Sequence, residues 1–500
     1  MKLGDYQMNM YKKVMIAWAV VMLMMASRVA AADVTVATVA VGDSIMTLSQ
    51  VAATGLPVLC VETVEHEEPT CDYVSAPAGC MGLGISNATK VPGRLTVYQR
   101  IGGMDSLMYD SGDYEKDVSG MTIKIRGNSS AYYDKKPYKI KLQKKRDLLF
   151  RGNESMYKDK NWVLLRDEML RTMAAFKVSR LVGMVWTPDC RYVNVVLNGV
   201  YRGVYLLCES VERNPDCRLN VDKNTGFIFE CDPYWWNEGV YVTSTHSPSY
   251  NYTFKYPDED EITPQQLAYM QGLVAAYEAS LTTPDYPQLI DVTSFAAWCL
   301  VHDIEGSKDE AGANRYYTKY DTTSASKIVM PMVWDFDMSE RTPSEWSRCH
   351  SVHMSILFNN PNRTYVNEYV RLWCQIRDHF VDDITSSMNA FETADEGVAL
   401  KAANKLELIK TGSNYPVDRY VWWRNKWFTE RYPWLDAAIM AMHVPHDVDV
   451  DGSVGISDVV ALVDMMLGNA PTMSIGDING DGIVGIDDVS DLIDELLAAD

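Results

Sequence analysis

Basic residues are missing from one end of this chain. Residues 447–500 hold 13 Asp or Glu and no Lys or Arg, so this tail carries 13 of the 21 net negative charges. Binding to nucleic acid needs clustered positive charge against the phosphates. We therefore expect no nucleic-acid partner, and we expect the tail to bind a divalent cation.

Two further absences limit the kinds of site and the location. No Cys-x-x-Cys pair occurs, which argues against a zinc ribbon or a thioredoxin-type site. The apolar run 14–25 is short of the roughly 20 residues that span a bilayer. Lys12 and Lys13 precede this run, and small residues follow at 30–32, so the pattern predicts a Sec signal peptide over 1–32. We therefore expect secretion to the extracellular space or cell surface and no stable transmembrane anchor.

The ten cysteines permit disulfides in an exported chain. They cluster at 60–80 and 190–231, so local pairs are expected, although several connectivities remain open.

The composition is 47% hydrophobic with 13 Trp and 29 Tyr, which is typical of a globular protein. Residues 33–118 form a β-rich region, and strands are expected at 121–126 and 137–142, with Lys139 and Lys141 on the polar face of the second. Asn198-Gly199 predicts a tight hairpin. Helices are expected at 166–184, 264–281, 292–301 and between 365 and 442, so the predicted class is α+β with a β-rich N-terminal and a helical C-terminal part.

After a linker at 443–446, the acidic tail is an internal repeat of period 30 that starts at Asp447 and again at Asp477. Each copy places oxygen ligands at loop positions 1, 3, 5 and 12, a carbonyl at 7 and Gly at 6, and then enters an apolar helix. This arrangement suits Ca²⁺, which takes six to eight oxygen ligands. The predicted calcium ligands are Asp447, Asp449, Asp451, Ser453 and Asp458 in the first loop, and Asp477, Asn479, Asp481, Ile483 and Asp488 in the second.

Position 12 is Asp in both loops, and no helix of the EF-hand type is expected before either. In these features residues 447–497, within a predicted domain at 447–500, resemble dockerins, small all-α modules that attach carbohydrate-active enzymes to cohesin scaffolds. The resemblance implies a cohesin-type scaffold protein as partner. The chain departs from clostridial dockerins at loop positions 10 and 11, where it has Ile456-Ser457 and Ile486-Asp487 in place of small hydroxyl residues.

Four phrases occur in order along residues 119–442: 124–130 (KIRGNSS), 135–142 (KKPYKIKL), 198–209 (NGVYRGVYLLCE) and 332–337 (MVWDFD). Together they resemble the CotH kinase family, secreted or spore-associated proteins with an atypical kinase fold. The resemblance implies transfer of phosphate from ATP, with Mg²⁺ or Mn²⁺, to an extracellular protein substrate.

Phosphoryl transfer needs cations for the nucleotide phosphates and carboxylates for the metal. Arg126, Lys139 and Lys141 flank a Gly-Asn-Ser-Ser turn and are the predicted nucleotide-binding cations, with Glu209 as the acid that pairs with one lysine. Four further residues are assigned partly or wholly from the family resemblance. Asp309 is assigned to catalysis or metal binding, Asp335 and Asp337, after an apolar strand, to magnesium binding, and Asn314 to a weaker role as a metal ligand.

Two other functions stay open. One is a catalytically inactive CotH-like adhesin or binding module in a dockerin-attached surface or polysaccharide-degrading assembly. This alternative is kept because the residue before Asp309 is Lys308, where many relatives have Asn. The other is a carbohydrate-active enzyme, for which the sequence shows no convincing pair of glycosidase carboxylates. Asp167 and Arg171 fit either a helix-surface pair or the active cleft. His302, His350 and His353 show no spacing typical of metal ligands.

Overall fold

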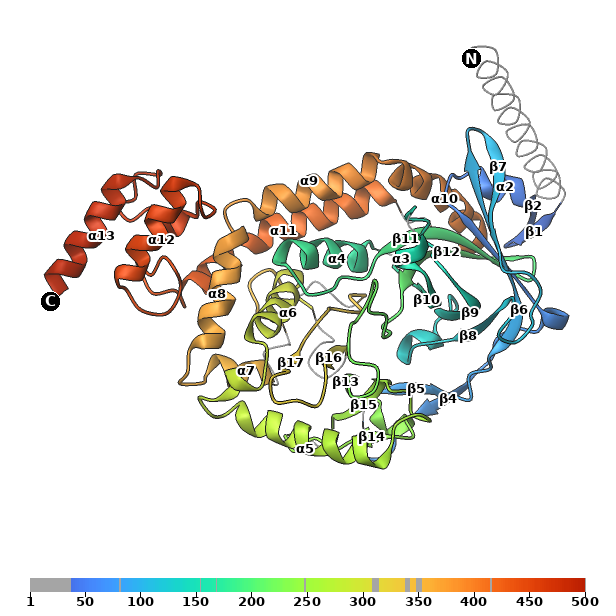
Figure 1. Cartoon of the computed structure of the whole chain (residues 1–500). Helices are drawn as coiled ribbons and strands as arrows, with labels where there is room; N and C mark the ends of the chain where they lie inside the picture. Colours follow the sequence, from blue (N-terminus) through green and yellow to red (C-terminus); the bar gives the residue numbers. More distant parts are fainter. Residues whose placement is uncertain are drawn as a thin grey trace, which may run out of the picture.

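The computed structural model describes residues 37–80, 82–152, 154–167, 169–246, 249–307, 314–337, 342–347, 353–413 and 416–499. The signal-peptide prediction, Asp309 and His350 lie outside these residues. The fold is mixed α+β, with a β-rich N-terminal part and a helical C-terminal part, as the sequence predicts (Figure 1). Among the described helices, none combines the length and the apolar character that crossing a membrane requires.

A seven-stranded β-barrel forms the N-terminal part, and β10 closes it by pairing with both β9 and β12. Its strands are β3 (Val58–Thr63), β6 (Val91–Ile101), β8 (Met121–Ile125), β9 (Tyr138–Arg146), β10 (Asp159–Leu165), β11 (Cys190–Leu197) and β12 (Val200–Glu209). β3 and β11 are parallel, and the other barrel pairs are antiparallel. β1 (Thr38–Val41) and β2 (Ser44–Thr47) extend the sheet beside β12, and β7 (Met104–Asp110) pairs with β6. The short helices α2 (Leu48–Ala52) and α3 (Glu154–Tyr157) lie between strands.

Alternating side chains fill the barrel and cover its outside. On β10, Trp162 and Leu164 belong to the buried interior, whereas Val163 and Leu165 belong to the core outside the barrel. β9 places Tyr138, Ile140 and Leu142 inside in the same way, so its lysines lie on the outer face, as predicted. The Asn-Gly hairpin is also confirmed, because Asn198 and Gly199 both have positive φ (51° and 72°) between β11 and β12.

A second sheet stands beside the barrel in the order β14 (Tyr241–Val242), β15 (Asn251–Tyr256), β13 (Phe227–Asp232), β16 (Arg315–Lys319) and β17 (Ile328–Val329). Helices α5 (Pro264–Ser280) and α6 (Val292–Glu305) fall between its strands in sequence. A separate hairpin, β4 (Asp72–Ser75) and β5 (Leu83–Ser86), lies near this sheet (Figure 1).

The helical part consists of α4 (Arg171–Val182), α7 (His353–Phe358), α8 (Thr364–Ile376), α9 (Phe380–Thr393), α10 (Asp395–Thr411) and α11 (Val417–Met440). One buried core joins these helices to the second sheet and to the outer face of the barrel. Figure 1 shows α9 and α11 side by side above α4. The barrel, the second sheet and the helices are therefore packed as one body.

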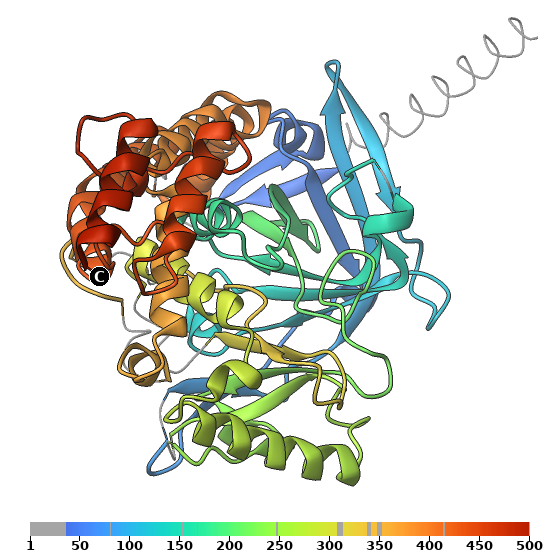
Figure 2. The same cartoon turned by 60° about the vertical axis from the view of Figure 1, so that its left-hand side comes forward.

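The acidic loops lead into α12 (Ile456–Leu467) and α13 (Ile486–Ala499), as the repeat predicts. These helices share a small core of their own, formed by Val448, Val459, Leu462, Met465, Val489 and Leu492. Both views place them at the end of the molecule away from the barrel (Figures 1 and 2). Asn367 of α8 donates to the Asp451 carbonyl (2.6 Å), so the first loop contacts the rest of the protein directly.

No disulfide joins any of the nine cysteines in the described part of the chain. The local disulfides expected from the two clusters are thus not formed there. Cys190 and Cys208 nevertheless stand directly opposite each other on β11 and β12.

Candidate functional site

A cleft of about 670 Å³ lies between the outer face of β8–β9 and the second sheet. Side chains of both signs line it. The basic residues are Lys124, Arg126, Lys139 and Lys255, and the acidic residues are Glu230, Asp232, Glu238, Asp335 and Asp337. A cleft of this size can hold a nucleotide, and its mixed charge suits a ligand that carries both phosphates and a metal ion.

The basic wall rests on β8 and β9. Lys124 and Lys139 are directly opposite each other in the strand register, an arrangement that is unfavourable for like charges. Burial, followed by the charge of Lys139, lowers the pKa of Lys124. Glu212 contacts Lys139 (2.7 Å), and the Arg126 guanidinium stacks over Trp334 at 5.9 Å from the ring centre. Excess positive charge on this wall favours binding of an anion.

The predicted Gly-Asn-Ser-Ser turn also lines the cleft, at residues 127–130. Gly127 has φ of 82°, and a Cβ there would lie 2.4 Å from the Ser130 hydroxyl oxygen. Only glycine fits such a position without moving its neighbour. The tight turn thereby brings backbone and hydroxyl groups next to the basic wall.

The opposite wall contains the predicted metal ligands Asn314, Asp335 and Asp337. Asn314 and Asp335 have positive φ (58° and 62°), a conformation that costs on the order of 1 kcal/mol outside glycine. The chain is braced here: Arg171 of α4 donates to the Asp337 carbonyl (2.7 Å), and Phe336 stacks on His302 at 4.9 Å. Two carboxylates and one amide thus line the same cleft as the basic wall.

Sequence reasoning missed the second sheet's own polar residues. Lys255 on β15 contacts Glu230 on β13 (3.0 Å), and the Thr253 hydroxyl donates to Asp232 (3.1 Å). Burial, and then the nearby charge of Glu230, raise the pKa of Asp232 to about 6. The signal was available, because Glu230 and Asp232 are two residues apart and so share one face of an otherwise apolar strand.

A known protein family matches the part of the chain that carries both walls of the cleft. Residues 123–381, more than half of the chain, match the family described as CotH kinase protein. The chain belongs to the CotH kinase family. A search of curated proteins found no match.

The CotH segment includes both walls of the cleft, but this chain adds a third from outside it. Gly82 and residues 85–88, of and beside β5, line the same cleft. Asn237 donates to the Ile85 carbonyl (2.6 Å), and Tyr132 donates to the Gly84 carbonyl (3.2 Å), so the β4–β5 hairpin is attached on both sides. The N-terminal region therefore shapes the cleft of this family member.

Two of the predicted nucleotide-binding residues do not reach the cleft. Lys141 is exposed and is not among its lining residues. The predicted pairing of Glu209 with a lysine is wrong: Glu209 contacts Arg151 (2.9 Å), and Lys139 contacts Glu212 instead. The reason is the sheet: β10 lies between β9 and β12, and the two side chains lie on opposite faces. Glu209 is opposite Trp162 of the barrel interior, and Lys139 is opposite Val163 of the outer core.

Asp309, the catalytic residue implied by the CotH resemblance, falls within 308–313, outside the described residues. The structure fixes the chain just before it. Arg431 of α11 donates to the Asp303 carbonyl, Tyr369 of α8 donates to the Asp303 carboxylate (2.8 Å), and Trp427 donates to the Ile304 carbonyl (3.0 Å). Asn314, just after this segment, lines the cleft.

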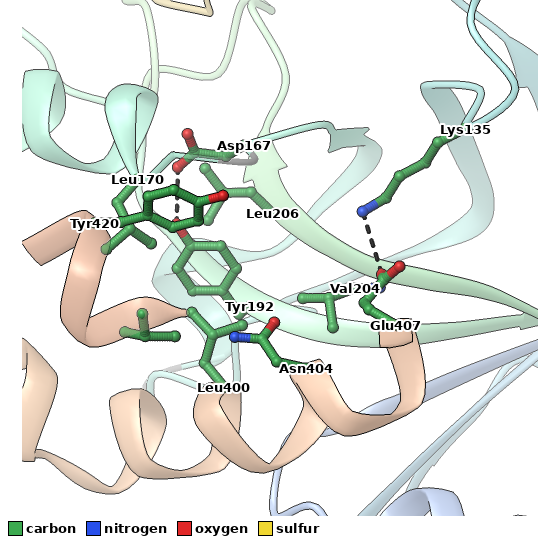
Figure 3. A pocket seen from close by; sticks show the side chains of 11 residues that line it. Lys135, Asp167, Leu170, Tyr192, Val204, Leu206, Leu400, Asn404, Glu407 and Tyr420 are labelled. Carbon is green, nitrogen blue, oxygen red and sulfur yellow. Dashed lines mark hydrogen bonds and ion pairs between the residues drawn. The ribbon is translucent and has the colours of Figure 1, made fainter. Parts of the chain in front are cut away.

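A second cavity, of about 30 Å³, lies between the barrel and α10 (Figure 3). It has room for about one water molecule. Lys135 contacts Glu407 at its edge (3.3 Å), and Tyr192 donates to Asp167 (2.8 Å). Asp167 also accepts from the backbone of Thr172 and Met173, and burial raises its pKa, so in this CotH protein it caps α4 outside the main cleft.

The two acidic loops at the C-terminal end repeat the same hydrogen bonds. The carboxylate at position 1 accepts hydrogen bonds from the backbone N–H groups at positions 5 and 6. The carboxylate at position 12 accepts hydrogen bonds from the backbone N–H groups at positions 2, 3 and 9. In the first loop, oxygens of Asp447, Asp449 and Asp451 lie within 4.8 Å of one another. Gly452 and Gly482 have φ of 100° and 90° at position 6. This arrangement gathers oxygen ligands that could hold a hard cation.

Proposed function

We propose that this CotH family member is a magnesium-dependent phosphotransferase that moves phosphate from ATP to a hydroxyl group of an extracellular protein. One observation carries the proposal: cations on and beside β8–β9 and carboxylates beside Trp334 line a single cleft of nucleotide size. Phosphoryl transfer consists mainly of holding phosphates, metal and acceptor in place, and this cleft offers groups for the first two.

The residues divide by chemistry. Lys124, Arg126 and Lys139 would hold the phosphates, and Asp335 and Asp337, with Asn314, would hold Mg²⁺ or Mn²⁺ through oxygen. The metal would neutralise charge on the phosphates when bound. Asp309 would orient the acceptor hydroxyl or take its proton, as the family resemblance implies.

The test uses two lysines of one strand. Lys139→Ala should weaken ATP binding about 10- to 100-fold, because a charge-assisted hydrogen bond is lost. Lys141→Ala, two residues along on the same face but outside the cleft lining, should leave the affinity unchanged. Calorimetric titration of ATP with Mg²⁺ measures both.

Substitutions of two acidic residues should affect nucleotide binding and turnover differently. Asp335→Asn should weaken binding of the metal–nucleotide complex, whereas Asp309→Asn should preserve affinity and lower turnover about a hundredfold or more. A phosphoryl-transfer assay beside the titration distinguishes these outcomes. If the unmutated protein binds no nucleotide with Mg²⁺ or Mn²⁺, the kinase proposal is wrong. The inactive adhesin or binding module then replaces it, an alternative that Lys308 beside Asp309 favours.

We also propose that the acidic loops bind Ca²⁺ and that residues 447–500 are a dockerin-like module for a cohesin-type partner. The matching hydrogen bonds of the two loops support calcium. A partner is supported by α12, where Ile456, Val460, Val463 and Leu467 recur at helical spacing and are exposed, Ile456 by 73%. Binding to cohesin domains should require calcium and should be lost in Val460→Asp; binding that persists in chelator would contradict this.

Secretion is proposed from the pattern at residues 1–32 alone. The exported protein should begin after the small residues 30–32, and mass spectrometry of its N-terminus tests this. Retention of the whole segment on a cell-associated protein would instead indicate an anchor.

A further inference from the structure

Two histidines and one glutamate meet at a point away from the cleft. His246 lies between β14 and β15, Glu278 lies on α5, and His353 begins α7. One ligand atom from each lies within 4.8 Å of the others. These three residues are not among those that line the cleft, and they are also remote in sequence from the acidic loops.

The orientation of His353 suits a metal ligand. Its Nε2 atom is 3.7 Å from Glu278 Oε1, too far for a good hydrogen bond. Two ligands of one tetrahedral zinc ion, each about 2.0–2.1 Å from the metal, lie roughly 3.4 Å apart. The other ring nitrogen, Nδ1, is 3.2 Å from the Tyr277 hydroxyl. A partner on the second nitrogen is how metal-binding histidines are usually held.

Glu278 is fully buried and oriented by four donors. Ser244 Oγ (2.6 Å) and Tyr252 OH (3.0 Å) donate to Oε1, and the Thr245 backbone and hydroxyl (2.5 and 2.6 Å) donate to Oε2. An ion bound to Oε1 would take the place of the Ser244 hydroxyl. The remaining donors would keep the carboxylate aimed at the same point.

The cluster combines a buried imidazole with a path for entry. His353 is buried, and imidazole nitrogen is a common ligand of transition-metal ions. His246 is exposed, which leaves the cluster open to solvent on one side. A site with three protein ligands and an open position commonly adds water.

We propose that His246, Glu278 and His353 bind a divalent transition-metal ion of the zinc class, with water completing its coordination. Two histidines and a carboxylate are a nitrogen and oxygen set that favours such an ion over Ca²⁺ or Mg²⁺. The ion would join the β14–β15 connection, α5 and α7. This site is independent of the proposed kinase and calcium functions, because it shares no residue with either.

The test uses the full chain with excess Ca²⁺, which saturates the acidic loops. Metal-free protein should take up about one equivalent of Zn²⁺, and Co²⁺ in its place should give the visible absorption of a low-coordinate, histidine-bound ion. His246→Ala should weaken Zn²⁺ binding at least tenfold and abolish the absorption; because His246 is exposed, this variant should fold.

His379→Ala is the matched control, since His379 is also exposed and contacts an acid, Asp383. It should leave Zn²⁺ binding and the absorption unchanged. Tyr277→Phe should weaken binding about tenfold by releasing the His353 ring. Protein that takes up no Zn²⁺ under these conditions, or Co²⁺ absorption that survives His246→Ala, overturns the proposal.

Discussion

Asp232 is a carboxyl group that the fold makes costly to ionise. It is 5% exposed, and burial together with Glu230 raises its pKa from 3.8 to about 6. The folded state therefore holds this proton more tightly than the unfolded state does. The resulting stability is present below about pH 4 and is lost as the pH rises through 6, a difference of about 3 kcal/mol at neutral pH.

Replacing this carboxyl group should consequently stabilise the protein. Asp232→Asn is expected to raise the free energy of unfolding by about 2–3 kcal/mol at pH 7 and by little at pH 4. Urea denaturation at the two pH values measures the difference. Asp260→Asn, at an exposed position, should change stability by less than about 0.5 kcal/mol. An Asp232→Asn variant that is less stable at pH 7 would show that the carboxylate is favourably paired.

The site residues show where sequence reasoning stops. Lys139 and Lys141 are equivalent in the strand pattern, but only Lys139 lines the cleft between β8–β9 and the second sheet. Asn314, Asp335 and Asp337 follow from short phrases and do line it. The His246, Glu278 and His353 cluster had no such phrase, because its members come from three separate elements.

At the scale of elements, α11 fixes the end of α6 that leads toward Asp309. Arg424 and Glu305 form a buried ion pair between the two helices, 1% and 0% exposed. Arg424→Met should lower the free energy of unfolding by about 3–5 kcal/mol, because the buried glutamate loses its arginine. Adding Glu305→Gln should restore part of the loss. Urea denaturation followed by circular dichroism measures each variant.

The control lies on the same helix. Lys426 contacts Glu430, and both are about half exposed, so Lys426→Met should change stability by no more than about 1 kcal/mol. Equal effects of Arg424→Met and Lys426→Met would contradict a structural role for the buried pair.

Local sequence patterns predicted these helices and strands well, but they did not predict the pairing of strands that are distant in sequence. The alternation of β9, the Asn198-Gly199 hairpin and helices α5 and α6 depend on neighbouring residues, and the sequence was sufficient for these. Closure of the barrel depends on β10 meeting β12 and on β3 meeting β11, which no local pattern encodes. The error over Glu209 has the same origin, since the strand order decided its partner.

At the scale of the whole molecule, the acidic loops should behave as a separate thermal unit. Their carboxylates repel one another until a cation binds, so calcium should stabilise residues 447–499 by about 2.7 kcal/mol for each loop that it occupies at a hundredfold excess over Kd. Calorimetry of the full chain should show one transition that moves down in chelator while the main transition stays. Asp447→Asn with Asp477→Asn should abolish the shift. A thermogram indifferent to chelator would contradict calcium binding.

The closed barrel can form only late in translation. β3 needs β11 as its second neighbour, and β10 needs β12, so the ring cannot close until residue 209 has left the ribosome. At about 5–20 residues per second, the earlier strands wait several seconds with an unpaired edge. During that interval the unpaired strand edges of the nascent chain can pair with strands of other chains. A chaperone that covers the first 200 residues would therefore help most at this stage.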